Sequence, residues 1–148
     1  MLTEEERGRI GERFAAPKQE TCKLYMATGT VANGDLVILY PAGIVDHQKV
    51  VTKCSGSGDV GVYGVVHCAD GETYENGNNI NIMIEGYKSD AKLTGAITVG
   101  HPLRASATAG YAEAAAATQL ASTILGFLCD DATGGTGART GGVLILPR

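Results

Sequence analysis

The sequence predicts a mainly β protein: a small β-barrel or β-sandwich with short strands and glycine-rich turns, preceded by a flexible or helical N-terminal arm. Glycine supplies 21 of the 148 residues, about twice its ordinary share of roughly 7%, which implies many turns. Apolar stretches recur between turn residues at a spacing close to the 8–12 residues typical of sandwiches and barrels. Ile80, Ile82 and Ile84 alternate with residues that face the other way, which is the period of a half-buried strand.

Residues 1–20 are expected to form a loose arm ahead of a single β domain, residues 21–148. The run from Thr3 to Glu6 has the form of a capping box, so a short helix over residues 4–14 is one conformation open to the arm. The two glycines inside that range each cost a helix about 1 kcal/mol. Such a helix would therefore be frayed in isolation.

The first strands of the domain surround a strong turn signal. Cys22–Met26 alternates in polarity, and Asn33-Gly34 predicts a tight turn because both residues tolerate positive φ. Leu36–Tyr40 then places five apolar or aromatic residues in a row. We expect that strand to be covered on both faces, by the barrel interior on one side and by a neighbouring subunit or the arm on the other.

The later strands are shorter and separated by turn residues. They are expected at Lys49–Cys54, Val60–Cys68, Ile80–Ile84, Lys92–Thr94, Ala96–Val99, Leu103–Ala105, Ile124–Cys129 and Val143–Leu146. Gly61 and Gly64 indicate bends or bulges in one of them. Tyr111–Ser122 is open: its alanines favour a helix, while its flanks and small side chains suit a closely packed strand.

Composition and charge exclude several classes of function. The net charge is −4, and the basic residues are scattered singly, so the chain lacks the basic patch that binds nucleic acid. No run of 18 apolar residues predicts a membrane span, and the charged first residues do not resemble a secretory signal. We therefore expect synthesis in the cytoplasm and no membrane partner.

The cysteines and histidines give no sign of a metal or redox site. Cys22, Cys54, Cys68 and Cys129 lie far apart in the sequence, and we expect four buried, reduced thiols, with a disulfide pair as the alternative in oxidising surroundings. His67 and Cys68 are adjacent in a predicted strand and so point to opposite faces. No metal and no cofactor are predicted.

Neither the glycine-rich run near the C-terminus nor the serines match a known catalytic or nucleotide-binding motif. The glycine-rich run 134–142 lacks the order and the setting of a phosphate-binding loop, and we expect a flexible hairpin loop before the last strand. No serine lies in a G-x-S-x-G turn. The chain therefore has no predicted catalytic residue, and we expect that it is not an enzyme.

One resemblance supports an enzyme as the alternative. The run 42–46, Ala-Gly-Ile-Val-Asp, and the run 109–111, Ala-Gly-Tyr, are similar to two motifs of the trimeric all-β dUTP pyrophosphatases. The order of the motifs is reversed here, and the Arg-Ser-containing phosphate motif is missing. This alternative would be a small nucleotide-hydrolysing enzyme that uses Asp46 and Tyr111.

A second resemblance covers almost the whole chain after the arm. It rests on a series of short motifs: A-N-G-D-L-V (32–37), G-V-V (64–66), I-E-G (84–86), I-T-V-G-H-P-L (97–103), A-T-A-G (107–110), I-L-G-F (124–127) and G-V-L-I-L (142–146). In this order they resemble the small β-barrel capsid decoration, or cement, proteins of tailed bacteriophages. His101-Pro102 stands where that family more often has an acidic residue.

The resemblance implies a structural protein of the virion. It implies a homotrimer that binds the major capsid protein on the outer surface of an icosahedral phage head and stabilises the capsid. The protein would be made in the host cytoplasm. Within the arm, we expect Arg7, Ile10, Arg13 and Phe14 to contact the capsid, because a loose segment can order on a groove or a free sheet edge.

Overall fold

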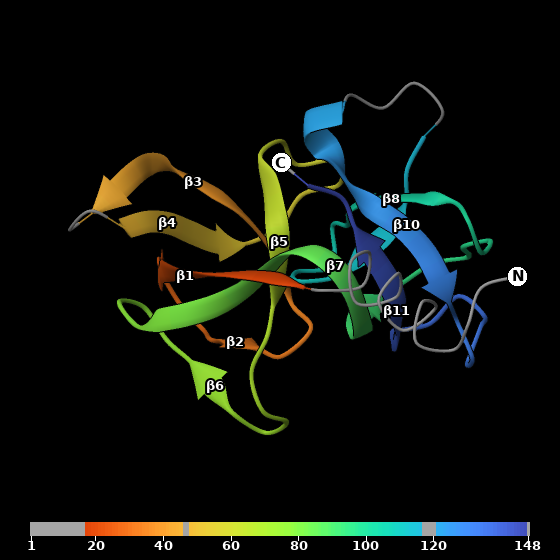
Figure 1. Ribbon diagram of the computed structural model, residues 1–148, viewed down its shortest axis with the longest axis horizontal. Helices are drawn as coiled ribbons and strands as arrows, with labels where there is room; N and C mark the ends of the chain where they lie inside the picture. The colour runs from red at the N-terminus through yellow and green to blue at the C-terminus, as the bar shows by residue number, and fades with distance from the viewer. Residues whose placement is uncertain (1–16, 46–47, 117–120, 148) are drawn as a thin grey trace, which may run out of the picture.

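A computed structural model describes residues 17–45, 48–116 and 121–147, and within these ranges the protein is mainly β, as the sequence predicts (Figure 1). The elements in chain order are β1 (Lys18–Leu24), β2 (Val31–Ala32), β3 (Leu36–Val45), β4 (Gln48–Lys53), β5 (Val62–Val66), β6 (Thr73–Tyr74), β7 (Asn79–Leu93), β8 (Pro102–Ala105), β9 (Ala112–Ala114), the 3-10 turn η1 (Ala121–Thr123), β10 (Ile124–Asp130) and β11 (Arg139–Ile145). The small pair β2–β6 forms a separate two-stranded sheet.

Five of the strands close into a β-barrel. Their order is β1-β4-β3-β5-β7, and the ring closes because β7 also pairs with β1. The β1–β4 pair is parallel, and the other four pairs are antiparallel. Closure leaves no free edge within this ring. Its interior is filled by buried side chains that include Val37, Val51, Val66, Ile80 and Ile82.

Strand β7 continues beyond the barrel into a second sheet, with the order β7-β11-β10-β8-β9. Residues 79–85 pair with barrel strands, whereas residues 86–93 pair with β11. Gly86 lies at the division with a φ of +110°, and a β-carbon there would lie 2.9 Å from the Cα atom of Pro17. Only glycine fits that conformation and that close approach. In Figure 1, β7 crosses from the barrel on the left to the second sheet on the right.

The strand after the Asn33-Gly34 turn is buried on both faces only at its start. Leu36 packs in the core between the barrel and the second sheet, whereas Val37 points into the barrel. Leu39 is 40% exposed, so two-sided burial ends within two residues. The expectation that the outer face meets a neighbouring subunit or the arm is wrong at Leu36, because the second sheet of the same chain covers it.

Asn33-Gly34 forms the predicted turn. Gly34 has a φ of +89°, and the Asp35 amide donates to the Ala32 carbonyl at 3.2 Å. A β-carbon on Gly34 would also lie 2.5 Å from the carbonyl oxygen of Asp90. The turn therefore packs directly against β7, and both its conformation and its neighbour require glycine.

Several predicted strands differ from the observed ones; for example, the last strand begins at Arg139, inside the run 134–142 that we expect to be a hairpin loop. Ala96–Val99 is not a strand but part of a loop, which turns where the His101 amide donates to the Thr98 carbonyl at 2.9 Å. Lys92–Thr94 is not a separate strand, since Lys92 and Leu93 end the long β7. β1 begins at Lys18 and pairs with β7 from that residue. The predicted boundary of the arm at residue 20 is therefore wrong, because residues 18–20 belong to the barrel.

The open segment Tyr111–Ser122 is neither one helix nor one strand. It begins with β9 (Ala112–Ala114), which pairs with β8, and it ends in the 3-10 turn η1. Pairing with β8 overrides the helix propensity of the alanines in β9, as tertiary contacts commonly do. The predicted helix of residues 4–14 lies outside the described residues.

Candidate functional site

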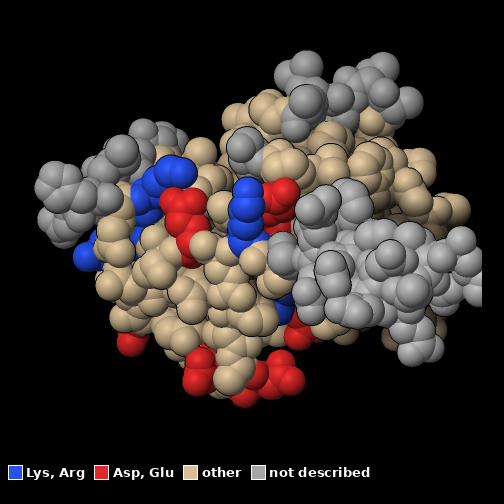
Figure 2. All heavy atoms as spheres, viewed as in Figure 1, with Lys and Arg blue, Asp and Glu red and all other residues tan. Residues whose placement is uncertain are grey.

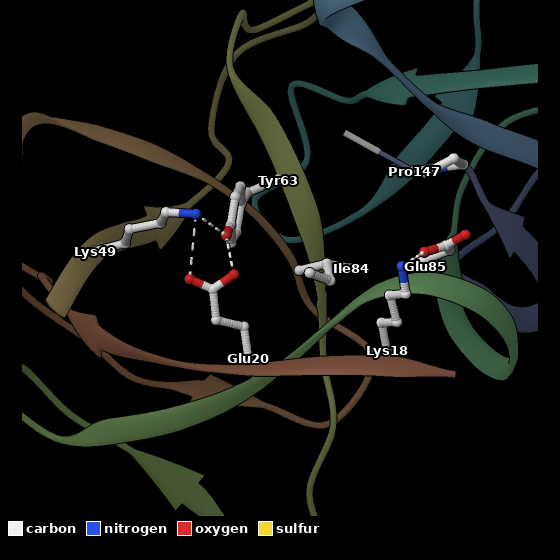
Figure 3. Close-up of a pocket in the computed structure, with 7 residues that line it drawn as sticks. All are labelled: Lys18, Glu20, Lys49, Tyr63, Ile84, Glu85 and Pro147. Carbon is white, nitrogen blue, oxygen red and sulfur yellow. Dashed lines mark hydrogen bonds and ion pairs between the residues drawn. The ribbon is translucent and has the colours of Figure 1, made fainter. Parts of the chain in front are cut away.

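A small pocket opens on the barrel, where the first described residues of the chain lie close to the last ones (Figure 3). It encloses about 170 Å³. Its lining comes from β1, β4, β5, β7 and the segment after β11: Lys18, Glu20, Lys49, Tyr63, Ile84, Glu85 and Pro147. Ion pairs flank it on two sides, Lys49 with Glu20 at 3.3 Å and Lys18 with Glu85 at 3.1 Å.

A buried tyrosine links the charges on one side of this pocket. The Tyr63 hydroxyl accepts a hydrogen bond from Lys49 Nζ at 2.8 Å and donates one to Glu20. Burial raises the pKa of Tyr63, and the bond to Glu20 raises it further. The bond to Tyr63 likewise raises the pKa of Lys49. Both groups are therefore protonated at neutral pH, so the cluster ties β1, β4 and β5 together and presents no free base.

A second cluster of charges lies beneath the Asn33-Gly34 turn. Asp35 is only 1% exposed, and its carboxylate accepts hydrogen bonds from Lys92 Nζ and from the Ala32 amide, both at 2.8 Å. Lys53 Nζ lies 3.6 Å from the same carboxylate. Buried charges are tolerated when they are paired and hydrogen-bonded in this way. The cluster fixes the turn against β4 and β7.

Lys88 continues this network towards His67. Its buried Nζ lies 2.6 Å from Asp90 Oδ1, 2.8 Å from Asn33 Oδ1 and 3.2 Å from His67 Nδ1. Burial opposes ionisation of Asp90, but the hydrogen bond and charge of Lys88 outweigh it and lower the pKa of Asp90 below its usual value. Among residues 17–45, 48–116 and 121–147, no group of three or more His, Cys, Asp or Glu residues is placed to hold a metal ion.

The second sheet carries a row of apolar side chains on its outer face, which we call the apolar row: Tyr87, Leu144, Phe127 and Pro102. Each is the direct cross-strand partner of the next, from β7 through β11 and β10 to β8. Direct partners project from the same face of a sheet. Tyr87 is 41% exposed, and Leu144 and Phe127 are each 37% exposed. Their sequence neighbours Val143, Ile145 and Leu128 face the core.

The apolar row contains no charged side chain. In the face drawn in Figure 2, basic side chains near the centre lie directly beside acidic ones, and acidic side chains alone occur along the lower edge. A contiguous apolar strip on a sheet face is typical of a contact surface. The row is therefore the best candidate for a binding surface in the described part of the chain.

The residues predicted for function fall mostly outside the structure's described ranges. Arg7, Ile10, Arg13 and Phe14 of the arm, and Asp46 of the alternative enzyme, lie there. Tyr111 is described: it lies just before β9, with its ring under Lys92 Nζ at 5.8 Å. The same Lys92 Nζ donates a hydrogen bond to Asp35.

The prediction of four buried thiols is only partly right. All four cysteines are free, and Cys22 and Cys54 are buried, but Cys68 is half-buried and Cys129 is exposed. Burial raises the pKa of Cys22 and of Cys54 to about 11. Cys129 is exposed because it follows Leu128 in a strand whose alternate residues face the core.

The comparisons with known proteins place the chain in no family: no protein-family model matches it, and no curated protein matches it. No described helix has the length and apolar character needed to cross a membrane. The function therefore has to be argued from the chain itself. Sequence reasoning missed the apolar row. A signal was present, because Phe127 and Leu144 each stand among consecutive apolar residues, and in a strand the side chains of consecutive residues point to opposite faces.

Proposed function

We propose that the protein is a structural protein that attaches as a homotrimer to the outer surface of an icosahedral tailed-phage head and stabilises the capsid. The observation that carries the proposal is the apolar row, a contact surface on a sheet that shares β7 with a closed barrel. A rigid body with such a surface is suited to binding another protein. Its partners would be the major capsid protein and two further copies of itself.

The resemblance to phage decoration proteins adds a second line of support. Its A-N-G-D motif forms the turn that is fixed by Asp35, and its I-L-G-F and G-V-L-I-L motifs form β10 and β11. The last two motifs carry Phe127 and Leu144 of the apolar row. Some of the segments that resemble the family therefore contribute to the proposed contact surface.

A trimer would bind a shell more tightly than a single copy. A head presents many copies of one site, so three linked copies gain avidity from several modest contacts. We propose that the arm makes one of these contacts, with Arg7, Ile10, Arg13 and Phe14 on the capsid. Removal of the arm should stop at residue 16, because Lys18 and Glu20 hold β1 in the barrel.

The proposal is tested with empty heads assembled from the major capsid protein of the phage that encodes the chain. The full chain and a chain without residues 1–16 are mixed with these heads and sedimented, and the heads are then heated. We expect the full chain to cosediment, to raise the temperature at which heads open, and to give a trimer in native mass spectrometry. The shortened chain should bind at least tenfold more weakly.

Two results would contradict the proposal. One is a protein that stays in the supernatant at concentrations far above those expected for a virion component. The other is release of pyrophosphate from dUTP by the purified chain, lost when Asp46 is replaced by Asn. That second result would support the alternative enzyme.

A further inference from the structure

We propose that the side chains of Lys88 and Asn33 react with each other and form an isopeptide bond, which ties the turn before β3 covalently to β7. The reaction is a self-modification of the folded chain, so it does not rest on the proposed function. The inference follows from the groups that converge on these two side chains: a carboxylate, a backbone amide and an imidazole.

The amine of Lys88 is buried and held against the carboxamide of Asn33. The Lys88 side chain is 4% exposed, and its Nζ donates a hydrogen bond to Asn33 Oδ1 at 2.8 Å. The Cγ atom that an amine would attack is bonded to that oxygen, so nucleophile and electrophile are already neighbours in the folded protein. Holding two reacting groups together in this way removes much of the entropic barrier to their reaction.

Asp90 contacts both the attacking group and the leaving group. Its Oδ1 lies 2.6 Å from Lys88 Nζ, and its Oδ2 accepts a hydrogen bond from Asn33 Nδ2 at 2.6 Å. A carboxylate in this place can take a proton from the ammonium, which frees the amine for attack, and can pass a proton to the departing nitrogen. The first contact alone would suffice for a structural ion pair, so the second is the one that points to chemistry.

A backbone amide polarises the carbonyl group that would be attacked. The Cys68 N–H donates to Asn33 Oδ1 at 3.1 Å. Negative charge develops on this oxygen when the amine adds to Cγ, and a hydrogen-bond donor already aimed at it stabilises that charge. On the other side of the amine, His67 Nδ1 lies 3.2 Å from Lys88 Nζ and, in the tautomer that leaves Nδ1 unprotonated, is a second acceptor for its protons.

The reaction needs no further reactant. The bond from Lys88 Nζ to Asn33 Cγ forms, and the bond from Cγ to Nδ2 breaks. Two of the three protons of the Lys88 ammonium group leave with Nδ2, so the products are a secondary amide and one ammonium ion. The Asp90 side chain is 40% exposed, which gives the released ammonium ion a route to solvent.

The new bond would join residues that are 55 positions apart in the sequence. It would hold the turn between β2 and β3 on the long strand that the barrel and the second sheet share. Like a disulfide, such a crosslink restricts the unfolded chain and thereby favours the folded one.

Intact-mass measurement of the purified full chain tests the inference. After several days at neutral pH, we expect a mass about 17 Da below that of the sequence, since one ammonia is lost, and a branched tryptic peptide that joins the segments around Asn33 and Lys88. Lys88→Arg should abolish the loss, because a guanidinium group stays protonated. Asp90→Asn should slow it about 100-fold or more. Lys18→Arg is the matched control and should keep the full loss, because Lys18 pairs with a carboxylate, Glu85, at 3.1 Å.

A succinimide at Asn33-Gly34 would also lose one ammonia, so the variants have to separate the two reactions. That cyclisation uses the backbone nitrogen of Gly34, whose N–H donates to the Val66 carbonyl at 2.9 Å in the folded chain. A loss of ammonia that persists in Lys88→Arg would overturn the inference, and so would an unaltered chain that keeps the mass of its sequence. Circular dichroism establishes that the variants are folded, and if Lys88→Arg does not fold, the presence or absence of the branched peptide in the unaltered chain decides.

Discussion

Replacing Asp35 with Ala is the sharpest test of what holds this fold together. The carboxylate is 1% exposed and accepts two hydrogen bonds of 2.8 Å, from Lys92 Nζ and from the Ala32 amide. Lys53 adds an ion pair at 3.6 Å. The substitution leaves both lysines and the amide without their acceptor at the turn between β2 and β3.

The expected cost follows from the burial of each partner. Breaking a fully buried ion pair costs about 3–5 kcal/mol, and an orphaned buried amide costs about 1–3 kcal/mol. The side chains of Lys92 and Lys53 are 25% and 21% exposed, so both can recover water and lower that cost. We expect Asp35→Ala to lose about 3 kcal/mol of unfolding free energy. Asp35→Asn keeps an acceptor for the amide and should lose about 2 kcal/mol.

Urea unfolding followed by circular dichroism measures this loss. With a denaturant slope of about 2 kcal/mol/M, a loss of 3 kcal/mol moves the midpoint by about 1.5 M. Asp70→Ala is the matched control, since Asp70 is exposed and its removal should change stability by less than about 0.5 kcal/mol. An Asp35→Ala midpoint within that same range would refute the argument that the buried carboxylate fixes the turn.

Three further predictions concern other ionisable groups. The hydrogen bonds from Arg139 lower the pKa of Asp131. This carboxylate therefore stabilises the fold above its unfolded pKa of about 3.9, and the stabilisation is lost as the pH falls through the lowered value. Asp131→Asn should cost about 1–2 kcal/mol of unfolding free energy at pH 7, and its urea midpoint should approach that of the unaltered chain only in acid. Tyr63→Phe removes one buried hydroxyl and should lower the melting temperature by about 2–4 °C, and an unchanged temperature would contradict the cluster described above. Cys129 should be alkylated before Cys22, whose pKa is about 11, when peptides are followed by mass spectrometry.

Local signals in the sequence predicted the elements that local chemistry determines. Asn33-Gly34 forms the expected turn because positive φ is required there. The alternation of Ile80, Ile82 and Ile84 correctly placed a strand, and the first two of these side chains are buried in the barrel. These features depend on residues close together in the chain, so a short window contains the information.

The features that sequence reasoning missed depend on partners far away in the chain. β7 is one strand of 15 residues, and its continuation through Gly86 depends on pairing with β1 on one side of that glycine and with β11 on the other. The apolar row needs the register of four strands before its members can be recognised as neighbours. Ala96–Val99 has the composition of a strand, but in the described part of the chain it lies in the loop between β7 and β8 and pairs with no strand.

The shared strand β7 joins the closed barrel to the apolar row. β1 is the first barrel strand, and it pairs with β7 as far as Glu85; the apolar row begins two residues later, at Tyr87. The row is thus carried on a strand that the closed barrel holds in place. Because Leu144 lies between Tyr87 and Phe127 in the row, we expect Leu144→Ser to weaken binding to phage heads, whereas Leu39→Ser, at an exposed position outside the row, should leave binding unchanged; equal binding by the two variants would contradict the role of the row.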